Sequence, residues 1–218
     1  MTRSQQACRG TTKPSASTRR DFLKTTGLVT GAALTGVSIA RMAHAAGEDP
    51  ILKIALIGCG GRGTGAAANA LEADPRTVLV AMADAFEDRL KSSLAALKKQ
   101  FPDRVKVTPE TSFVGFEAYK SAIQSDVDVV LLCEPPHFRP IHLKAAIEAG
   151  KHVFAEKPVA VDAAGYRSVL ESTELARQKG LCIVSGLCWR YHRATIETVK
   201  RIQDGAVGDI IAIQETYN

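Results

Sequence analysis

The 218-residue sequence has few cysteines, and most of them lie far apart. It has no long apolar stretch and, beyond its first segment, no excess of basic charge. None of the spacings between its five cysteines matches a zinc site, so no metal site is predicted. A disulfide framework is not expected in a chain that can form so large an apolar core. Cys59, Cys133 and Cys182 lie in or beside apolar runs, which predicts that they are buried small hydrophobes.

The net charge of +5 is concentrated near the N-terminus. The first 45 residues hold seven basic residues and one acid, a net charge of +6, which leaves −1 for the rest of the chain. A chain with this balance lacks the basic surface that binding to nucleic acid requires. We therefore expect no nucleic-acid partner.

Residues 1–45 are interpreted as an export signal. Thr18–Lys24 forms a twin-arginine box, the weakly hydrophobic run Thr25–Ala40 follows, and Ala43–Ala45 supplies small residues for cleavage before Ala46. A membrane anchor is the alternative, but the run is too short and too rich in glycine for a stable span. The predicted partner is the twin-arginine export machinery, and the predicted location is periplasmic or exported.

The stretch Leu52–Gly63 is an apolar run followed directly by a glycine-rich turn. Its glycines fit the pattern Gly-x-Gly-x-x-Gly, a helix-prone run follows over Thr64–Ala73, and Asp84 ends the next apolar run, Thr77–Ala83. A strand, a glycine turn, a helix, a second strand and an acid in this order are typical of dinucleotide binding. The alternative is a glycine-rich turn in an unrelated α/β protein. The predicted cofactor-binding residues of the loop are Gly58, Gly60, Gly61, Arg62 and Gly63.

Each part of this pattern has a physical role. Gly58 permits the tight turn, Gly60 lets a pyrophosphate approach the backbone, and Gly63 allows close packing of helix on strand. The helix N-terminus offers free N–H groups to the phosphates. Asp84 is expected to accept hydrogen bonds from the adenosine ribose, and its charge would repel a 2′-phosphate. NAD is therefore the predicted cofactor, and NADP is less favoured.

The rest of the chain alternates between strand-like and helix-like segments, which predicts an α/β fold with a Rossmann-type, doubly wound parallel sheet. The further predicted strands are Val105–Val107, Val127–Cys133, His152–Ala155 and Leu181–Ser185. The further predicted helices are Glu87–Gln100, Phe113–Ser125, Ile141–Ala149 and Ala163–Gln178.

Two loops are expected at the carboxyl ends of strands, where open α/β sheets bind their ligands. Glu134 and Pro135 begin the first loop, and His137 in it is either a cofactor contact or a solvated loop histidine. His142 is expected to be structural and His152 non-catalytic. Glu156, Lys157 and Pro158 begin the second loop. There a lysine can stabilise the alkoxide that develops when hydride leaves a hydroxyl-bearing carbon, although a surface lysine in a turn is the alternative.

The run Ala149–Pro158, AGKHVFAEKP, closely resembles the AGKHV-x-x-EKP motif of the glucose–fructose oxidoreductase, inositol dehydrogenase and rhizopine-catabolism (Gfo/Idh/MocA) family. The glycine loop precedes it by about the distance found in that family, and Gly205–Ile211 resembles the family's lead into a second domain. The resemblance covers residues 51–218. It implies that Lys157 is the catalytic lysine, that Glu156 lies beside the nicotinamide ribose and that the Lys157–Pro158 bond is cis. Glu134 departs from the family's usual Thr-Pro loop start.

The resemblance also implies a domain division. Residues 1–45 are the signal, 46–185 an NAD-binding Rossmann domain, and 186–218 the start of a truncated α+β domain with an open antiparallel sheet for substrate binding and oligomerisation. Within that last segment Arg190 and Tyr191 are either substrate contacts or interdomain packing, and Ile210–Tyr217 is expected to be the first strand. A homo-oligomer is expected at full length.

Three functions remain open. The first is an exported NAD-dependent oxidoreductase that transfers hydride between a bound cofactor and a sugar, cyclic polyol or glycoside. The second is an NAD-dependent glycoside hydrolase that oxidises its substrate transiently. The third is a non-catalytic nucleotide-binding fragment. Twin-arginine export supports a tightly held cofactor, because that route exports proteins that have already folded around one.

Overall fold

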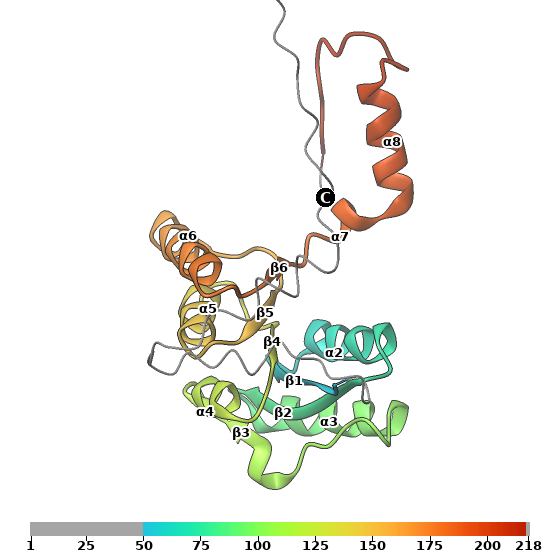
Figure 1. Ribbon diagram of the computed structural model, residues 1–218. Helices are drawn as coiled ribbons and strands as arrows, with labels where there is room; N and C mark the ends of the chain where they lie inside the picture. The colour runs from blue at the N-terminus through green and yellow to red at the C-terminus, as the bar shows by residue number, and fades with distance from the viewer. Residues whose placement is uncertain (1–49, 217–218) are drawn as a thin grey trace, which may run out of the picture. The chain divides into compact units, whose positions relative to one another are not determined.

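Residues 50–216 are described in the computed structural model, and a six-stranded parallel sheet lies at their centre (Figure 1). The strand order is β3-β2-β1-β4-β5-β6. This order reverses direction between β1 and β4, which is the topological switch point of a doubly wound sheet. The Rossmann-type fold predicted from the sequence is confirmed. The strands are β1 (Leu52–Ile57), β2 (Thr77–Asp84), β3 (Ser112–Val114), β4 (Val129–Leu132), β5 (His152–Ala155) and β6 (Ile183–Ser185).

Helices cover both faces of the sheet (Figure 1). Helices α2 and α3 pack on one face, and α4, α5 and α6 on the other, so the apolar core has two halves. Successive residues of β1 serve opposite halves: Ile54 and Leu56 face α2 and α3, whereas Ala55 and Ile57 face the other layer. Burial on both sides explains the near-continuous hydrophobicity of the central strands. The helices are α2 (Gly61–Ala73), α3 (Glu87–Gln100), α4 (Ala118–Gln124), α5 (Arg139–Glu148) and α6 (Ala163–Gln178), with a 3-10 turn η2 (Pro109–Thr111).

Local signals explain where several helices begin. The Asp162 side chain accepts a hydrogen bond from the Gly165 amide at 2.6 Å and caps α6. Helix α5 has a proline in its first turn, where the missing N–H is not needed. Helix α3 carries acids in its first turn and lysines in its last, in the order that its dipole favours.

Two predictions about the edge of the sheet were wrong. The segment Val105–Val107 is not a strand, since it contributes only an isolated bridge between Val105 and Leu79. The third strand is instead Ser112–Val114, which pairs with the end of β2 and lies where a helix had been expected to begin. Helix α4 therefore starts five residues later than predicted, at Ala118. A three-residue edge strand depends on its neighbour for hydrogen bonds and leaves little pattern in the sequence.

After β6 the chain forms α7 (Cys188–Tyr191) and α8 (Arg193–Gln203). None of the residues of α8 is buried. The strand expected over Ile210–Tyr217 is not found in its described part, residues 210–216. A single alternating segment needs a neighbouring strand, and these residues have none among those described. The twin-arginine box and the cleavage segment lie outside the described residues.

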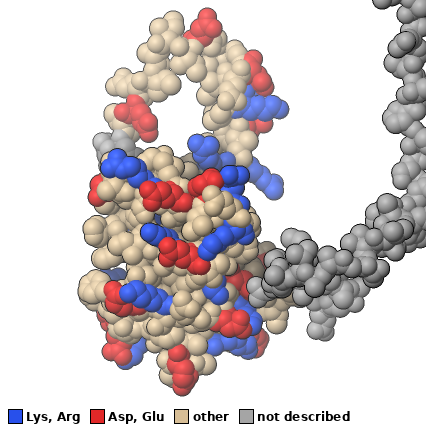
Figure 2. Space-filling model, turned by 60° about the vertical axis from the view of Figure 1, so that its left-hand side comes forward, with Lys and Arg blue, Asp and Glu red and all other residues tan. Residues whose placement is uncertain are grey.

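The surface carries charges of both signs. Figure 2 shows Lys and Arg interspersed with Asp and Glu over the face that it presents, without a broad field of one sign. Within residues 50–216, no helix has both the length and the apolar character needed to cross a bilayer.

Candidate functional site

The glycine loop joins β1 to α2 at the switch point. Gly58 has a φ of 89°, and a Cβ there would lie 2.4 Å from the amide nitrogen of Glu134. A Cβ on Gly63 would lie 1.8 Å from the carbonyl oxygen of Gly58, so the first turn of α2 packs directly on the loop. By contrast, a Cβ on Gly60 or Gly61 would meet nothing within 4 Å. The loop is therefore closed towards the sheet and open towards the pocket, which suits the backbone approach of a pyrophosphate.

Asp84 lies at the end of β2 beside this loop. Its carboxylate accepts hydrogen bonds from the Cys59 amide at 2.6 Å and the Phe86 amide at 2.9 Å. The Asp84 side chain therefore holds the glycine loop in place from the neighbouring strand β2, a role that the sequence did not indicate. Each carboxylate oxygen can accept more than one hydrogen bond, so the predicted contact with a ribose hydroxyl remains compatible with this arrangement.

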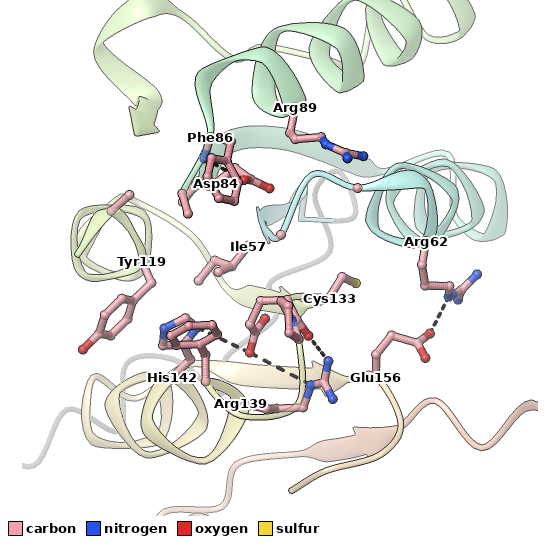
Figure 3. Close-up of a pocket in the computed structure, with 18 of the residues that line it drawn as sticks. Ile57, Arg62, Asp84, Phe86, Arg89, Tyr119, Cys133, Arg139, His142 and Glu156 are labelled. Carbon is pink, nitrogen blue, oxygen red and sulfur yellow. Dashed lines mark hydrogen bonds and ion pairs between the residues drawn. The ribbon is translucent and has the colours of Figure 1, made fainter. Parts of the chain in front are cut away.

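A pocket of about 750 Å³ opens along the carboxyl ends of the strands (Figure 3). It runs from Asp84, Phe86 and Arg89 at one end to Glu156 and Lys157 at the other. Its size and its place at the switch point match the binding site of a dinucleotide in open α/β sheets. The predicted site residues that line it are Gly58, Gly60, Gly61, Arg62, Asp84, Glu134, Pro135, Glu156 and Lys157.

Lys157 lies on the loop after β5, where the Lys157–Pro158 peptide bond is cis, as expected. Its side chain is exposed at the pocket, and among residues 50–216 no hydrogen bond or ion pair holds its ammonium group. Glu156, next to it, is buried and pairs with Arg62 at 2.6 Å (Figure 3). This pair joins the loop after β5 to the first turn of α2. The ammonium of Lys157 is thus left available to a bound molecule.

The loop after β4 places its polar groups differently from the prediction. Both carboxylate oxygens of Glu134 are buried, and one lies 3.4 Å from Nδ1 of His142 and 4.0 Å from Nε of Arg139. The His142 ring stacks on Tyr119 with centroids 3.9 Å apart. His137 is exposed, packs edge-on against Phe138, and is not among the residues that line the pocket. The structure therefore brings His142, rather than His137, to this site.

The sequence gave no signal for Arg139, His142 or Tyr119 as site residues. They come from α4 and α5 and line the pocket from the side opposite the glycine loop. Neither Arg190 nor Tyr191 reaches this pocket. Both are exposed on α7, and Tyr191 lines a second, apolar pocket of about 490 Å³ with residues of α2, β5 and β6. Their predicted contact with substrate stays a prediction.

The cysteines around the site are protected from reaction. Burial raises the pKa of the Cys133 thiol to about 12, and burial next to Asp84 raises the pKa of the Cys59 thiol well above its usual range. Cys182 and Cys188 are free and exposed, so the burial predicted for Cys182 was wrong. Among residues 50–216, no three His, Cys, Asp or Glu side chains are placed to hold a metal ion.

We expect iodoacetamide near pH 8 to alkylate Cys182 and Cys188 much faster than Cys59 and Cys133. A thiol with a pKa of about 12 has only about 10⁻⁴ of its molecules as the reactive thiolate at that pH. Peptide mapping by mass spectrometry after brief alkylation measures all four in one sample. Alkylation of Cys133 at the rate of Cys188 would contradict the buried site described here.

The fold and the site together define a class. Three features are typical of a dinucleotide-dependent enzyme: a glycine loop that opens into a long pocket, an acid at the end of β2, and a lysine at the far end of the pocket. Residues 52–186 match the family described as "Oxidoreductase family, NAD-binding Rossmann fold" (GFO_IDH_MocA). The chain belongs to this family, which the AGKHVFAEKP run had indicated.

Known relatives agree on the family and differ in their reactions. The chain is 28% identical over 177 residues to a dTDP-3,4-didehydro-2,6-dideoxy-alpha-D-glucose 3-reductase of Actinomadura kijaniata, which covers 81% of this chain and 48% of that protein. It is 26% identical over 162 residues to a glycosyl hydrolase family 109 protein of Streptomyces coelicolor, which covers 74% and 33%. Among solved structures it resembles scyllo-inositol dehydrogenase from Lactobacillus casei with bound NAD(H) and scyllo-inositol. The TM-score is 0.57 at 25% identity, covering 72% of this chain and 42% of that one. The chain thus spans about half of these relatives' length or less.

Proposed function

We propose that this protein is an NAD-dependent oxidoreductase that transfers hydride between a bound nicotinamide cofactor and a sugar, cyclic polyol or glycoside. The observation that carries the proposal is that the glycine loop and Lys157 open into one continuous pocket. Membership of the oxidoreductase family supports it, as does the similarity to a sugar reductase and an inositol dehydrogenase.

The residues divide into two groups along the pocket. The open backbone at Gly60 and Gly61 and the first N–H groups of α2 would hold the pyrophosphate, and Asp84 would bind the adenosine ribose. When bound, the nicotinamide accepts or supplies the hydride. In the oxidation direction, Lys157 would hold its ammonium against the substrate oxygen and stabilise the negative charge that develops there as hydride leaves the carbon and the hydroxyl proton passes to water. Twin-arginine export with the cofactor already bound, and assembly into a homo-oligomer, complete the proposal.

A second function, NAD-dependent glycoside hydrolysis through transient oxidation, is supported by the similarity to the glycosyl hydrolase family 109 protein. The same loop and the same lysine serve both reactions, because each begins with removal of hydride from a carbon that bears a hydroxyl group. The two reactions differ in the fate of the reduced cofactor: the oxidoreductase accumulates NADH, whereas the hydrolase oxidises it again within each turnover.

The test starts with the purified full-length protein. We expect denaturation to release a nucleotide with the mass of NAD, and we expect NADH to accumulate with at least one member of a panel of aldoses, inositols and glycosides. Cleavage of a glycoside without accumulated NADH selects the hydrolase. Nucleotide binding with no turnover on the panel selects a non-catalytic binding protein. A protein that binds neither NADH nor ADP-ribose overturns the proposal.

A further inference from the structure

Arg139 is the first residue of α5 and is only 2% exposed. Its guanidinium group donates to the backbone carbonyl of Glu134 and to the backbone carbonyl of Pro158. Glu134 lies on the loop after β4, whereas Pro158 directly follows Lys157 on the loop after β5. One buried side chain therefore ties together the two loops that border the far end of the pocket.

These bonds begin where the sheet can no longer connect the two segments. Strands β4 and β5 pair as far as Leu132 and Ala155, and the last backbone bond between them runs from the Glu156 amide to the Leu132 carbonyl at 2.9 Å. Beyond it, within the described part of the chain, no backbone hydrogen bond joins the Glu134 loop to Lys157 or Pro158. The guanidinium of Arg139 supplies the connection that the ladder lacks.

The surroundings of Arg139 leave it little freedom. Its Nε faces the buried carboxylate of Glu134 at 4.0 Å, and in residues 50–216 neither that nitrogen nor the carboxylate oxygens has a hydrogen-bond partner. The side chain is thus fixed mainly by its two bonds to carbonyl oxygens. A planar guanidinium can bridge two acceptors at a fixed angle, whereas a lysine ammonium on a flexible stem cannot hold both in the same way.

We propose that Arg139 is a positioning residue that sets the separation of the two loops. That separation fixes the width of the nicotinamide end of the pocket, on which NADH binding depends, and the place of Lys157 there, on which turnover depends. The inference rests on the proposed function, because it assigns that end of the pocket to the nicotinamide. Arg139 acts through the backbone on either side of Lys157 and does not itself take part in the chemistry.

Arg139→Lys tests this proposal, since it keeps the positive charge beside Glu134 and removes the fork. Two ligands separate the ends of the pocket: ADP-ribose lacks the nicotinamide, and NADH has it. We expect Arg139→Lys to weaken NADH binding about tenfold or more, while ADP-ribose affinity changes less than about twofold. The emission of bound NADH should also shift towards that of the free cofactor. Arg177→Lys is the matched control, because Arg177 pairs with Glu174 on the exposed surface of α6 and its replacement should leave both affinities unchanged.

Parallel losses of NADH and ADP-ribose affinity, or no loss of either, would overturn the positioning role.

A second comparison asks whether Arg139 merely balances the charge of Glu134. Both Glu134→Gln and Glu134→Gln/Arg139→Gln replace the carboxylate with a neutral amide. We expect the double variant still to bind NADH about tenfold more weakly than the single one. Equal NADH affinity in these two variants would reduce Arg139 to a counter-ion. If the unaltered protein binds ADP-ribose but Arg139→Lys has no effect, only this inference fails. If the unaltered protein binds neither ligand, the proposed function fails as well.

Discussion

Replacing Lys157 with methionine is expected to lower kcat by about 10² to 10⁴ in the full-length protein while leaving cofactor binding largely intact. Methionine has nearly the same length and shape but cannot donate a hydrogen bond or carry charge. The Lys157 ammonium has no partner among the described side chains, so its removal leaves no buried charge unpaired. The loss should therefore fall on the step in which the substrate oxygen gains negative charge.

The measurement compares kcat with the affinity for NADH, using whichever substrate the panel identifies. A fall in kcat with NADH affinity unchanged within about threefold assigns Lys157 to the reaction rather than to binding. Lys91→Met serves as the control, because Lys91 pairs with Glu87 on the exposed surface of α3. Unchanged turnover in Lys157→Met would refute the catalytic role of this lysine.

The sequence predicts best those elements whose cause is local. Helices over Glu87–Gln100 and Ala163–Gln178 and the strand over His152–Ala155 have the bounds expected from periodicity and caps. Each of these segments carries its own apolar pattern, so its type does not depend on which neighbour it meets. The glycine loop could be recognised from its own strand–turn–helix pattern, although in the fold Gly58 packs against the backbone of Glu134 on the loop after β4.

Other elements depend on partners that are distant in the sequence. The strand Ser112–Val114 exists because the end of β2 offers it free backbone groups at the edge of the sheet. The expected strand over Ile210–Tyr217 has a suitable alternation but no partner among the described residues. Local pattern establishes that a segment can be a strand, and its partners decide whether it becomes one.

The same distinction applies to the site. Lys157 and Asp84 could be placed from the sequence because each directly ends a strand or follows one. Arg139 could not, because its partners are backbone carbonyls of residues 134 and 158, and carbonyl groups carry no sequence signal. His142 was assigned to structure for the sound reason that it lies within a helix. Its position against Glu134 depends on how α5 packs on the end of β4.

The glycines of the loop permit a test in which one methyl group affects the fold and another affects only binding. A Cβ on Gly63 would lie 1.8 Å from the Gly58 carbonyl oxygen, whereas a Cβ on Gly60 would face open space. We expect Gly63→Ala to lower the free energy of unfolding by about 3 kcal/mol or more, because backbone must move to admit it. That corresponds to a fall in Tm of about 10 °C for a domain of this size.

Gly60→Ala should leave Tm unchanged and weaken both NADH and ADP-ribose about tenfold or more, which is at least about 1.4 kcal/mol of binding free energy. The added methyl group costs nothing in the free protein and occupies the space that the pyrophosphate needs. Gly65→Ala is the control within α2, since its Cβ would meet only the end of the Arg62 side chain at 3.8 Å. It should raise stability slightly through helix propensity and keep both affinities. If Gly60→Ala binds both ligands as well as the unaltered protein, the dinucleotide does not pass over this loop, and the open side of the glycine turn needs another explanation.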